Sequence, residues 1–149
     1  MNLRNWIGAC GIALATATPA FAQQPAPAGH VKVASGSAFI VRAGATVPVQ
    51  TGQAVFEADS LKTGADGRVG ITLKDDTRVS IGPSSEVLLA SFLYTPSDGQ
   101  LGLAIKFIKG VAVYVSGRIA KLAPDSVRLE TPAAILGVRG TTLAVRVAE

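Results

Sequence analysis

Cysteine and histidine are almost missing from this 149-residue sequence, which contains one of each, Cys10 and His30. A structural zinc site needs four ligands, most often Cys or His, so these two residues cannot build one. A Ser-His-Asp triad would have to use His30, and no serine lies in a G-x-S-x-G turn or an S-x-x-K pair. We therefore predict no catalytic residue, no metal site and no cofactor, and a protein that is not an enzyme.

Aromatic residues are also scarce, at 5% of the chain, and charged residues make up 16%. Proteins that bind single-stranded nucleic acids use aromatic side chains on which bases stack, and proteins that bind duplexes gather their basic residues in a patch. Here the basic residues are dispersed from Lys32 to Arg146, and the net charge is only +4. We predict no nucleic-acid partner.

The N-terminus carries the three parts of a secretory signal. Arg4 provides a positive start, an apolar stretch runs from Trp6 to Ala17, and Ala20-Phe21-Ala22 forms an A-x-A cleavage site. The apolar stretch is shorter than the roughly 20 residues of a membrane span. We predict a signal peptide over residues 1–22 with cleavage after Ala22, a periplasmic or secreted mature chain, and no stable membrane insertion after cleavage.

Cleavage would also remove Cys10, and with it any disulfide or thiol chemistry of the mature chain. The alternatives are an uncleaved anchor and lipidation at Cys10, but few residues precede this cysteine and the apolar stretch continues beyond it. Residues 23–29 are rich in Pro and Ala and are predicted to form an extended linker. Residues 30–149 are then long enough to form one domain with a core of its own.

Within residues 30–149, apolar and polar side chains alternate in short runs that end at Gly, Asp, Ser or Pro. In the clearest run, Val69, Ile71 and Leu73 point to one face of a half-buried strand. Similar apolar rows recur, in residues 79–81, 87–89, 101–107, 111–115, 127–129 and 143–147. We predict an all-β domain of about ten or more short strands, folded as a compact antiparallel β-sandwich or roll, or as a short β-solenoid.

One hairpin can be given a register from this alternation. If residues 68–74 pair with residues 77–82, a one-residue slip exchanges the core face and the solvent face. A three-residue loop, Asp75-Asp76-Thr77, keeps the apolar side chains together by setting Leu73 opposite Val79. We predict that loop and that register.

The same reasoning applies to the apolar rows on either side of Gly110. A loop of Ile108-Lys109-Gly110 would set Phe107 opposite Val111, with the glycine at the left-handed position of the loop. Both loop predictions assume antiparallel neighbours. A coil of stacked strands with bends at the same points satisfies the alternation equally well.

Several short segments, taken in their order along the chain, resemble the FecR domain. The most specific is the closing stretch 131–145, in which a Thr-Pro dipeptide is followed by Gly-Val-Arg-Gly-Thr and a final strand. The others are Gly44, Gly52, residues 58–64, residues 66–68, residues 71–77 and residues 82–85. The resemblance covers residues 30–147 and implies an all-β periplasmic domain without enzymatic activity.

Carried over to this sequence, the resemblance marks eleven residues as motif positions and possible partner contacts. They are Asp59, Thr63, Gly64, Asp66, Gly67, Thr131, Pro132, Gly137, Arg139, Gly140 and Thr141. We expect Asp59, Thr63, Gly64 and Asp66 to secure a turn through side-chain-to-backbone hydrogen bonds. For Arg139 there are two hypotheses, a structural one, in which it pairs with a carboxylate or caps carbonyls, and an exposed anchor for a protein partner.

In well-known members of this family, the domain belongs to a membrane-spanning regulator that relays siderophore occupancy of an outer-membrane receptor to a sigma factor. We expect no cytoplasmic regulatory region, no mature transmembrane helix and no further receptor-contacting module here. The hypothesis is a binding or scaffold domain of the cell envelope that contacts an envelope protein. The alternatives are a carbohydrate- or cell-wall-associated module, a component of siderophore-type signalling that works with separate membrane proteins, and, least favoured, a small hydrolase.

Overall fold

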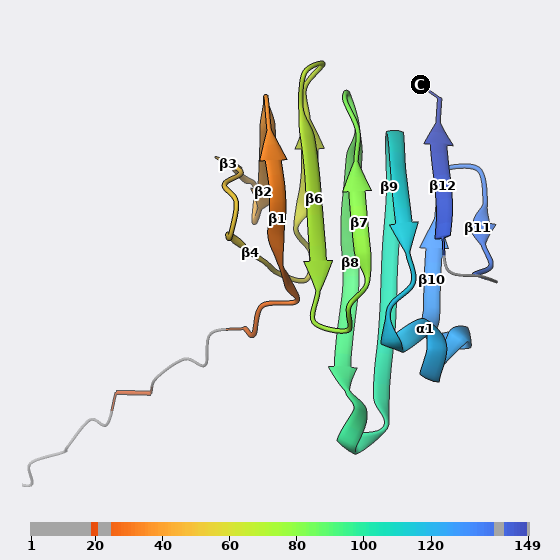
Figure 1. Cartoon of the computed structure of the whole chain (residues 1–149). Coiled ribbons are helices and arrows are strands. Elements are labelled where there is room, and N and C mark those ends of the chain that lie inside the picture. The colour runs from red at the N-terminus through yellow and green to blue at the C-terminus, as the bar shows by residue number, and fades with distance from the viewer. Residues whose placement is uncertain (1–18, 21–24, 139–141, 149) are drawn as a thin grey trace, which may run out of the picture.

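The computed structural model describes residues 19–20, 25–138 and 142–148 (Figure 1). Most of the predicted signal peptide and its cleavage site at Ala22 therefore lie outside the described residues. The first strand begins at Gly29, and Ala28 before it is already buried. No helix among the described residues is long and apolar enough to cross a membrane.

Strands dominate the described chain, which confirms the all-β prediction. Three helical segments, each of five residues or fewer, connect strands: η1 (Pro96–Asp98), α1 (Arg118–Leu122) and η2 (Pro124–Ser126). The strands are β1 (Gly29–Ser35), β2 (Ala38–Arg42), β3 (Ala45–Pro48), β4 (Ala54–Val55), β5 (Ser60–Thr63), β6 (Arg68–Leu73), β7 (Arg78–Ile81), β8 (Glu86–Thr95), β9 (Gln100–Val115), β10 (Val127–Glu130), β11 (Ile135–Leu136) and β12 (Thr142–Val147).

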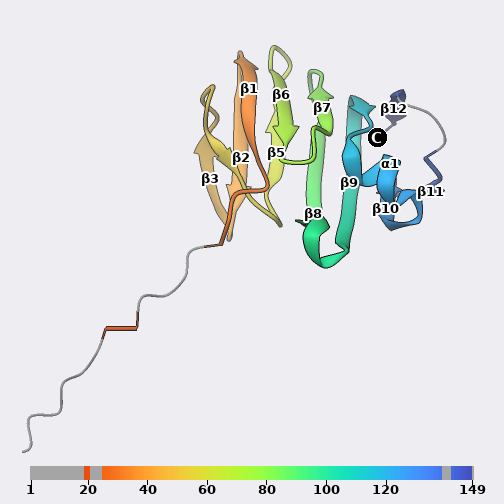
Figure 2. The ribbon, with the colours of Figure 1, turned by 60° about the horizontal axis from the view of Figure 1, so that its bottom comes forward.

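All twelve strands belong to one sheet that curls into a half-barrel (Figures 1 and 2). The main path runs β3-β2-β5-β8-β9-β7-β6-β1-β4, while β10 and β12 join it at β9 and β11 joins β10. The predicted sandwich is therefore corrected, because one sheet bends around the core in place of two separate sheets. The pairing is antiparallel throughout except for β10, which runs parallel to β9.

The sixteen-residue strand β9 is the reason that a single sheet can enclose the core. Its first part pairs with β8 and β10, and its last part pairs with β7 and β12. The division falls at Gly110, which has a φ of 85°. A Cβ atom at this position would lie 2.1 Å from the Ser85 Oγ atom, so the glycine is required both by backbone conformation and by space.

The predicted loop at Ile108-Lys109-Gly110 is therefore wrong, because the strand continues through it. The bend at Gly110 also changes which side chains face the core. Phe107 is buried before the bend, whereas Ala112 and Tyr114 are buried after it. The apolar row of residues 111–115 consequently points away from the core, and Val113 is 39% exposed.

The β6–β7 hairpin differs from its predicted register by two residues. Ile71 pairs with Val79, and the Leu73 N–H donates to the Thr77 carbonyl oxygen at 2.8 Å, so the three-residue loop is Lys74-Asp75-Asp76. A shift of two residues keeps every side chain on its predicted face. The loop begins earlier because Asp76 takes the left-handed position, with a φ of 68°.

The core lies on the concave side of the sheet. Its largest fully buried side chains include Tyr114 and Phe107 from β9, Leu61 from β5 and Leu129 from β10. Ile119 of the short helix α1 is also fully buried, and it packs into the same cluster. Burial of large apolar side chains contributes about 1.5–3 kcal/mol each relative to exposure, so this cluster stabilises the curled sheet.

Candidate partner-binding site

Asp59 lies in the connection between β4 and β5 and is completely buried. Both of its carboxylate oxygens accept hydrogen bonds from Arg42, at 2.8 Å from Nε and 2.6 Å from Nη2. The Phe56 N–H donates to the same carboxylate at 2.8 Å. Asp59 therefore holds the connection 56–59 against the end of β2.

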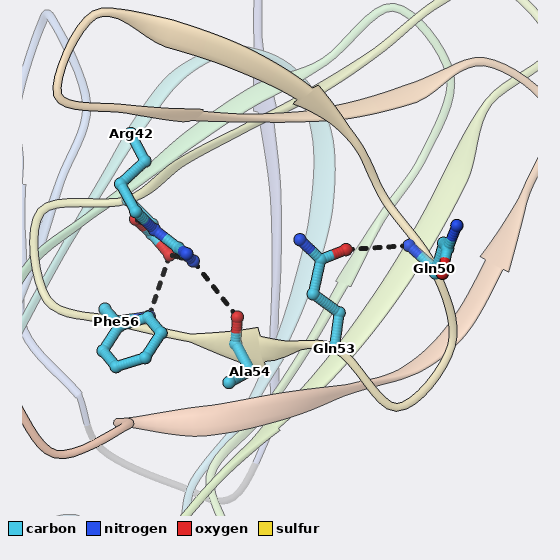
Figure 3. A network of polar contacts seen from close by, with 6 residues as sticks. Arg42, Gln50, Gln53, Ala54 and Phe56 are labelled. Carbon is cyan, nitrogen blue, oxygen red and sulfur yellow. Dashed lines mark hydrogen bonds and ion pairs between the residues drawn. The ribbon is translucent and has the colours of Figure 1, made fainter.

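Arg42 is held from several sides at once. Its Nη2 atom also donates to the Ala54 carbonyl oxygen at 3.2 Å, and its guanidinium lies 4.5 Å from the centre of the Phe56 ring (Figure 3). The hydrogen bond to Asp59, helped by the carboxylate charge, raises the pKa of Arg42 above its ordinary value despite partial burial. Its side chain is 41% exposed beside a hollow of about 370 Å³.

Thr63 connects β5 to the bend of β9 through Ser85. The Thr63 hydroxyl donates to the Gly82 carbonyl oxygen at 2.6 Å and accepts from the Ser85 N–H at 2.9 Å. The Ser85 hydroxyl in turn accepts from the Val111 N–H at 2.9 Å. These two buried hydroxyls satisfy backbone groups at the point where the sheet turns, as buried polar groups require.

The Gly64–Gly67 turn packs against the β1–β2 connection. Asp66 accepts a hydrogen bond from the Ser37 N–H at 3.2 Å, and the Gly64 N–H donates to the Ser37 carbonyl oxygen at 2.8 Å. A Cβ atom at Gly67 would lie 2.0 Å from that carbonyl oxygen, so no larger residue fits there without movement. Hydrogen bonds from the Ser37 side chain and backbone lower the pKa of Asp66.

A second buried carboxylate, Asp75, has a different set of partners. It accepts hydrogen bonds from the Thr77 hydroxyl at 2.7 Å, the Thr77 N–H at 3.1 Å and the Ile119 N–H at 3.2 Å. These contacts fix α1 to the β6–β7 loop. Tyr114 is buried beside this cluster, and burial raises the pKa of its hydroxyl.

The closing part of the motif begins with a turn that is exposed to solvent. The Thr131 N–H donates to the Ala134 carbonyl oxygen at 2.8 Å, and the Ala134 N–H donates to the Thr131 hydroxyl at 3.1 Å. Pro132 lies inside this turn and lines a small hollow of about 250 Å³ beside Phe107. The turn delivers the chain into β11.

Strand β11 is bonded only to β10 among the described strands, and Ile135 on it is 66% exposed. A hollow of about 540 Å³ lies beside it, lined by η2, β10 and β11 and by Gly137 and Val138. Nearby, the Glu130 carboxylate forms ion pairs with Arg128 Nε at 3.3 Å and with Lys106 Nζ at 3.9 Å. This edge combines an exposed apolar side chain with a hollow that a partner side chain can enter.

The eight predicted site residues that the structure describes fall into two groups in space. Asp59, Thr63, Gly64, Asp66 and Gly67 form internal contacts near β5, whereas Thr131, Pro132 and Gly137 lie along the edge at β11. Arg139, Gly140 and Thr141 lie outside the described residues, and both hypotheses for Arg139 stay predictions. Within the described ranges, no group of three or more His, Cys, Asp or Glu side chains could hold a metal ion.

The sequence alone did not identify Arg42, the partner of Asp59, because Arg42 is the last residue of β2 and belongs to none of the motif segments. Nothing in the sequence pairs a residue at the end of β2 with one in the β4–β5 connection, 17 positions further along the chain. Sequence reasoning also interpreted Asp75 only as a turn residue. The Asp-x-Thr spacing of Asp75 and Thr77 is a recognisable signal, because short polar side chains bond to backbone groups two residues away.

The described chain is thus a small all-β domain with a curled sheet. One group of motif residues is internal, near β5, and the other lies along the exposed edge at β11, beside a hollow. Compared with known protein families, the chain matches the model described as FecR protein over residues 59–149, and it therefore belongs to the FecR family. This is a signalling and regulatory family whose domain is typically periplasmic. The match begins at Asp59 and includes all eleven motif residues, whereas Gly44 and Gly52 precede it. Neither the curated proteins nor the solved structures gave a match.

Proposed function

We propose that this chain is an exported, non-enzymatic binding domain of the cell envelope, and that it acts by contacting another envelope protein through the edge at β11. Membership of a signalling and regulatory family supports a role in protein contacts. The observation that carries the proposal is the position of Ile135, two-thirds exposed beside a 540 Å³ hollow within the matched part of the chain.

The internal contacts near β5 support the choice of this edge. Asp59 and Thr63 use their polar atoms on groups of the same chain, and both are buried. Residues of this kind contribute to a partner surface only indirectly, by holding the fold. The motif residues around β11, in contrast, lie at the surface beside Ile135, an exposed apolar side chain that could enter the apolar centre of an interface.

Crosslinking in cells tests this proposal. A photoreactive phenylalanine analogue replaces Ile135 in the full chain, and a control chain carries it at Val47, which is 44% exposed on β3 at the other end of the sheet. We expect one envelope protein to be captured at position 135 and not at position 47. Equal capture at both positions, or capture at neither, would contradict the proposal.

The same cells test export. We expect the chain in the periplasmic or secreted fraction, with Gln23 as its first residue. A chain that keeps residues 1–22 would point to the anchored alternative.

A regulatory role beside separate membrane proteins is the second candidate, and family membership favours it. The crosslinked partner distinguishes the two, because a membrane-spanning regulator or an outer-membrane receptor would indicate signalling. Retention of the chain on isolated peptidoglycan, without a protein crosslink, would instead favour the cell-wall hypothesis.

A further inference from the structure

The convex side of the sheet carries a row of small and β-branched side chains that crosses five strands. Strands β1, β6, β7, β9 and β12 lie side by side there (Figure 1). Their pairing brings together, in order, Val33, Gly70, Ser80, Val113 and Ala144. Because the middle residues have short side chains, the row is a trough, and a hollow of about 510 Å³ lies over it.

Arginines border this trough on both sides. Arg68 lies two residues before Gly70 on β6, and Arg146 lies two residues after Ala144 on β12, where it pairs with Val111. Arg78 lies two residues before Ser80 on β7. Arg68 and Arg146 line the hollow on one long side of the row. Since β6 and β7 are antiparallel, Arg78 borders the other long side of the row, just outside the hollow.

The three arginines have no partner for their charge. Among the residues that the structure describes, none of their side chains makes a hydrogen bond or an ion pair. The described strands also place no Asp or Glu on this face. Its other members include His30, Ser35, Thr72, Val111, Val115 and Thr142, and Lys32 is exposed beside Val33 on β1. The face therefore combines exposed apolar surface with positive charge of one sign only.

The distances between the arginines and across the apolar floor limit which kind of ligand can bind in the trough. The two arginine borders are four residues apart along a strand, so at about 3.4 Å per residue they lie about 14 Å apart, and five strands extend about 19 Å along the trough. An amphiphile with a single anionic head would reach one border only. A flat bilayer would contact the arginines but not the apolar floor between them, because the floor lies below their side chains.

We propose that this trough binds a segment of a partner protein in which apolar side chains lie between acidic residues on both sides. The apolar side chains would cover Val33, Val113 and Ala144, and the carboxylates would pair with the arginines, whose guanidinium groups bind carboxylates in a bidentate manner. This inference rests on the proposed role as a protein-binding domain, but it uses a different face from the edge at β11.

Selection from a displayed library of short random peptides tests this inference directly. The wild-type chain is the bait, and selected peptides are synthesised and titrated against purified variants. Peptides that bind the trough should carry Asp or Glu on both sides of an apolar stretch. The variant Arg68→Glu/Arg146→Glu should bind them at least about tenfold more weakly, as expected when charges that face carboxylates are reversed.

Two further variants make the result specific. Lys74→Glu/Lys121→Glu has the same net charge as the arginine variant, but its two exposed positions do not line the trough, so it should bind like the wild type. Ala144→Trp keeps all charges and fills the trough, so it should lose binding. Circular dichroism and thermal unfolding verify that each variant is folded.

Other outcomes overturn the inference. Selection of peptides without acidic residues would overturn it. So would peptides whose binding is unchanged by either the arginine variant or Ala144→Trp. Binding that is lost on changing Ile135 but not the arginines would reject the trough and leave the proposed function intact. Arginine-dependent binding to phosphatidylglycerol vesicles with no acidic peptide selected would assign the face to a membrane surface. Peptide binding at the trough without a crosslink at position 135 would retain this inference and reject the β11 edge.

Discussion

The two parts of the FecR motif behave differently in this structure. Around β5, Asp59 is buried with Arg42, and Thr63 is buried against Ser85. Around β11, Thr131 bonds only within its own turn, and Ile135 projects from the surface. One part of the motif is therefore used to build the fold and the other lies where a partner can reach it. Membership of a motif does not by itself place a residue at a binding surface.

The difference has a physical origin in where the chain needs polar side chains. A connection that crosses the open end of a half-barrel leaves backbone groups buried, and side chains must satisfy them. Asp59 and Thr63 do so for the connections on either side of β5. The turn at Thr131 is exposed, so water can satisfy most of its backbone groups. We expect substitutions in the first part to reduce stability and substitutions in the second part to leave it nearly unchanged.

The largest expected effect is that of Asp59→Ala. The substitution leaves the Phe56 N–H without its acceptor and Arg42 without its counter-charge. Removing one member of a buried ion pair costs about 3–5 kcal/mol, and we expect about 3 kcal/mol because Arg42 can still reach water. Equilibrium unfolding in urea measures the loss.

The neighbouring Glu57→Ala is the control, since Glu57 is exposed and should change stability by no more than about 0.5 kcal/mol. A double-mutant cycle with Arg42→Ala then separates the interaction between the two side chains from the loss of the backbone hydrogen bond. If Asp59→Ala were as stable as Glu57→Ala, the motif would not be holding the fold at β5.

The same substitution, Gly→Ala, made once in each part of the motif, compares the two parts directly. A Cβ atom at Gly67 would lie 2.0 Å from the Ser37 carbonyl oxygen, whereas one at Gly137 would meet no atom within 4 Å. We expect Gly67→Ala to destabilise the domain by about 1–3 kcal/mol, as overpacking does, and Gly137→Ala to stay within about 0.5 kcal/mol. Thermal unfolding of the two variants, measured side by side, provides the comparison. Equal melting temperatures would contradict the predicted difference between the two parts of the motif.

The sequence predicted the fold class and six of the twelve described strands, β6 to β10 and β12, because alternation is a local property. It failed where one residue changes the alternation. At Gly110 the strand bends without ending, so Val111, Val113 and Val115 face outward although their alternation predicts a core row. At β1 an irregularity between Val31 and Val33 likewise turns Val33 to the outer face. Each change depends on how neighbouring strands pack, which no local pattern contains.

The candidate surfaces show the same limit. The motif residues could be picked out from the sequence, but which of them are buried could not, because Arg42 and Asp59 meet only after β2 and β4 are placed. The trough was not predictable at all. Its floor and its arginines come from five strands, and their meeting depends on four separate registers. Three of these registers involve β1 or the last part of β9, where the alternation did not reveal the bend.

The smallest expected effect concerns Asp66, which belongs to the first part of the motif but lies at the surface. Hydrogen bonds from Ser37 lower its pKa below the ordinary value of 3.8, so the ionised carboxylate is favoured in the folded chain. Its contribution to stability is therefore complete above the unfolded-state value and is lost as the pH falls through the lower folded-state value. We expect the stability difference between wild type and Asp66→Asn to be constant near neutral pH and to change only at acidic pH, below the ordinary Asp range.

Urea unfolding midpoints of the two chains, measured from about pH 6 down to about pH 2, determine this difference. Asp98→Asn is the matched control, because Asp98 is exposed in η1 and its side chain makes no hydrogen bond or ion pair with the described residues. A difference for Asp66→Asn no more pH-dependent than that for Asp98→Asn would mean that the Ser37 contact is not maintained in solution. Asp66 would then join the exposed part of the motif, and the division between a buried part and an accessible part would fall between Thr63 and Asp66.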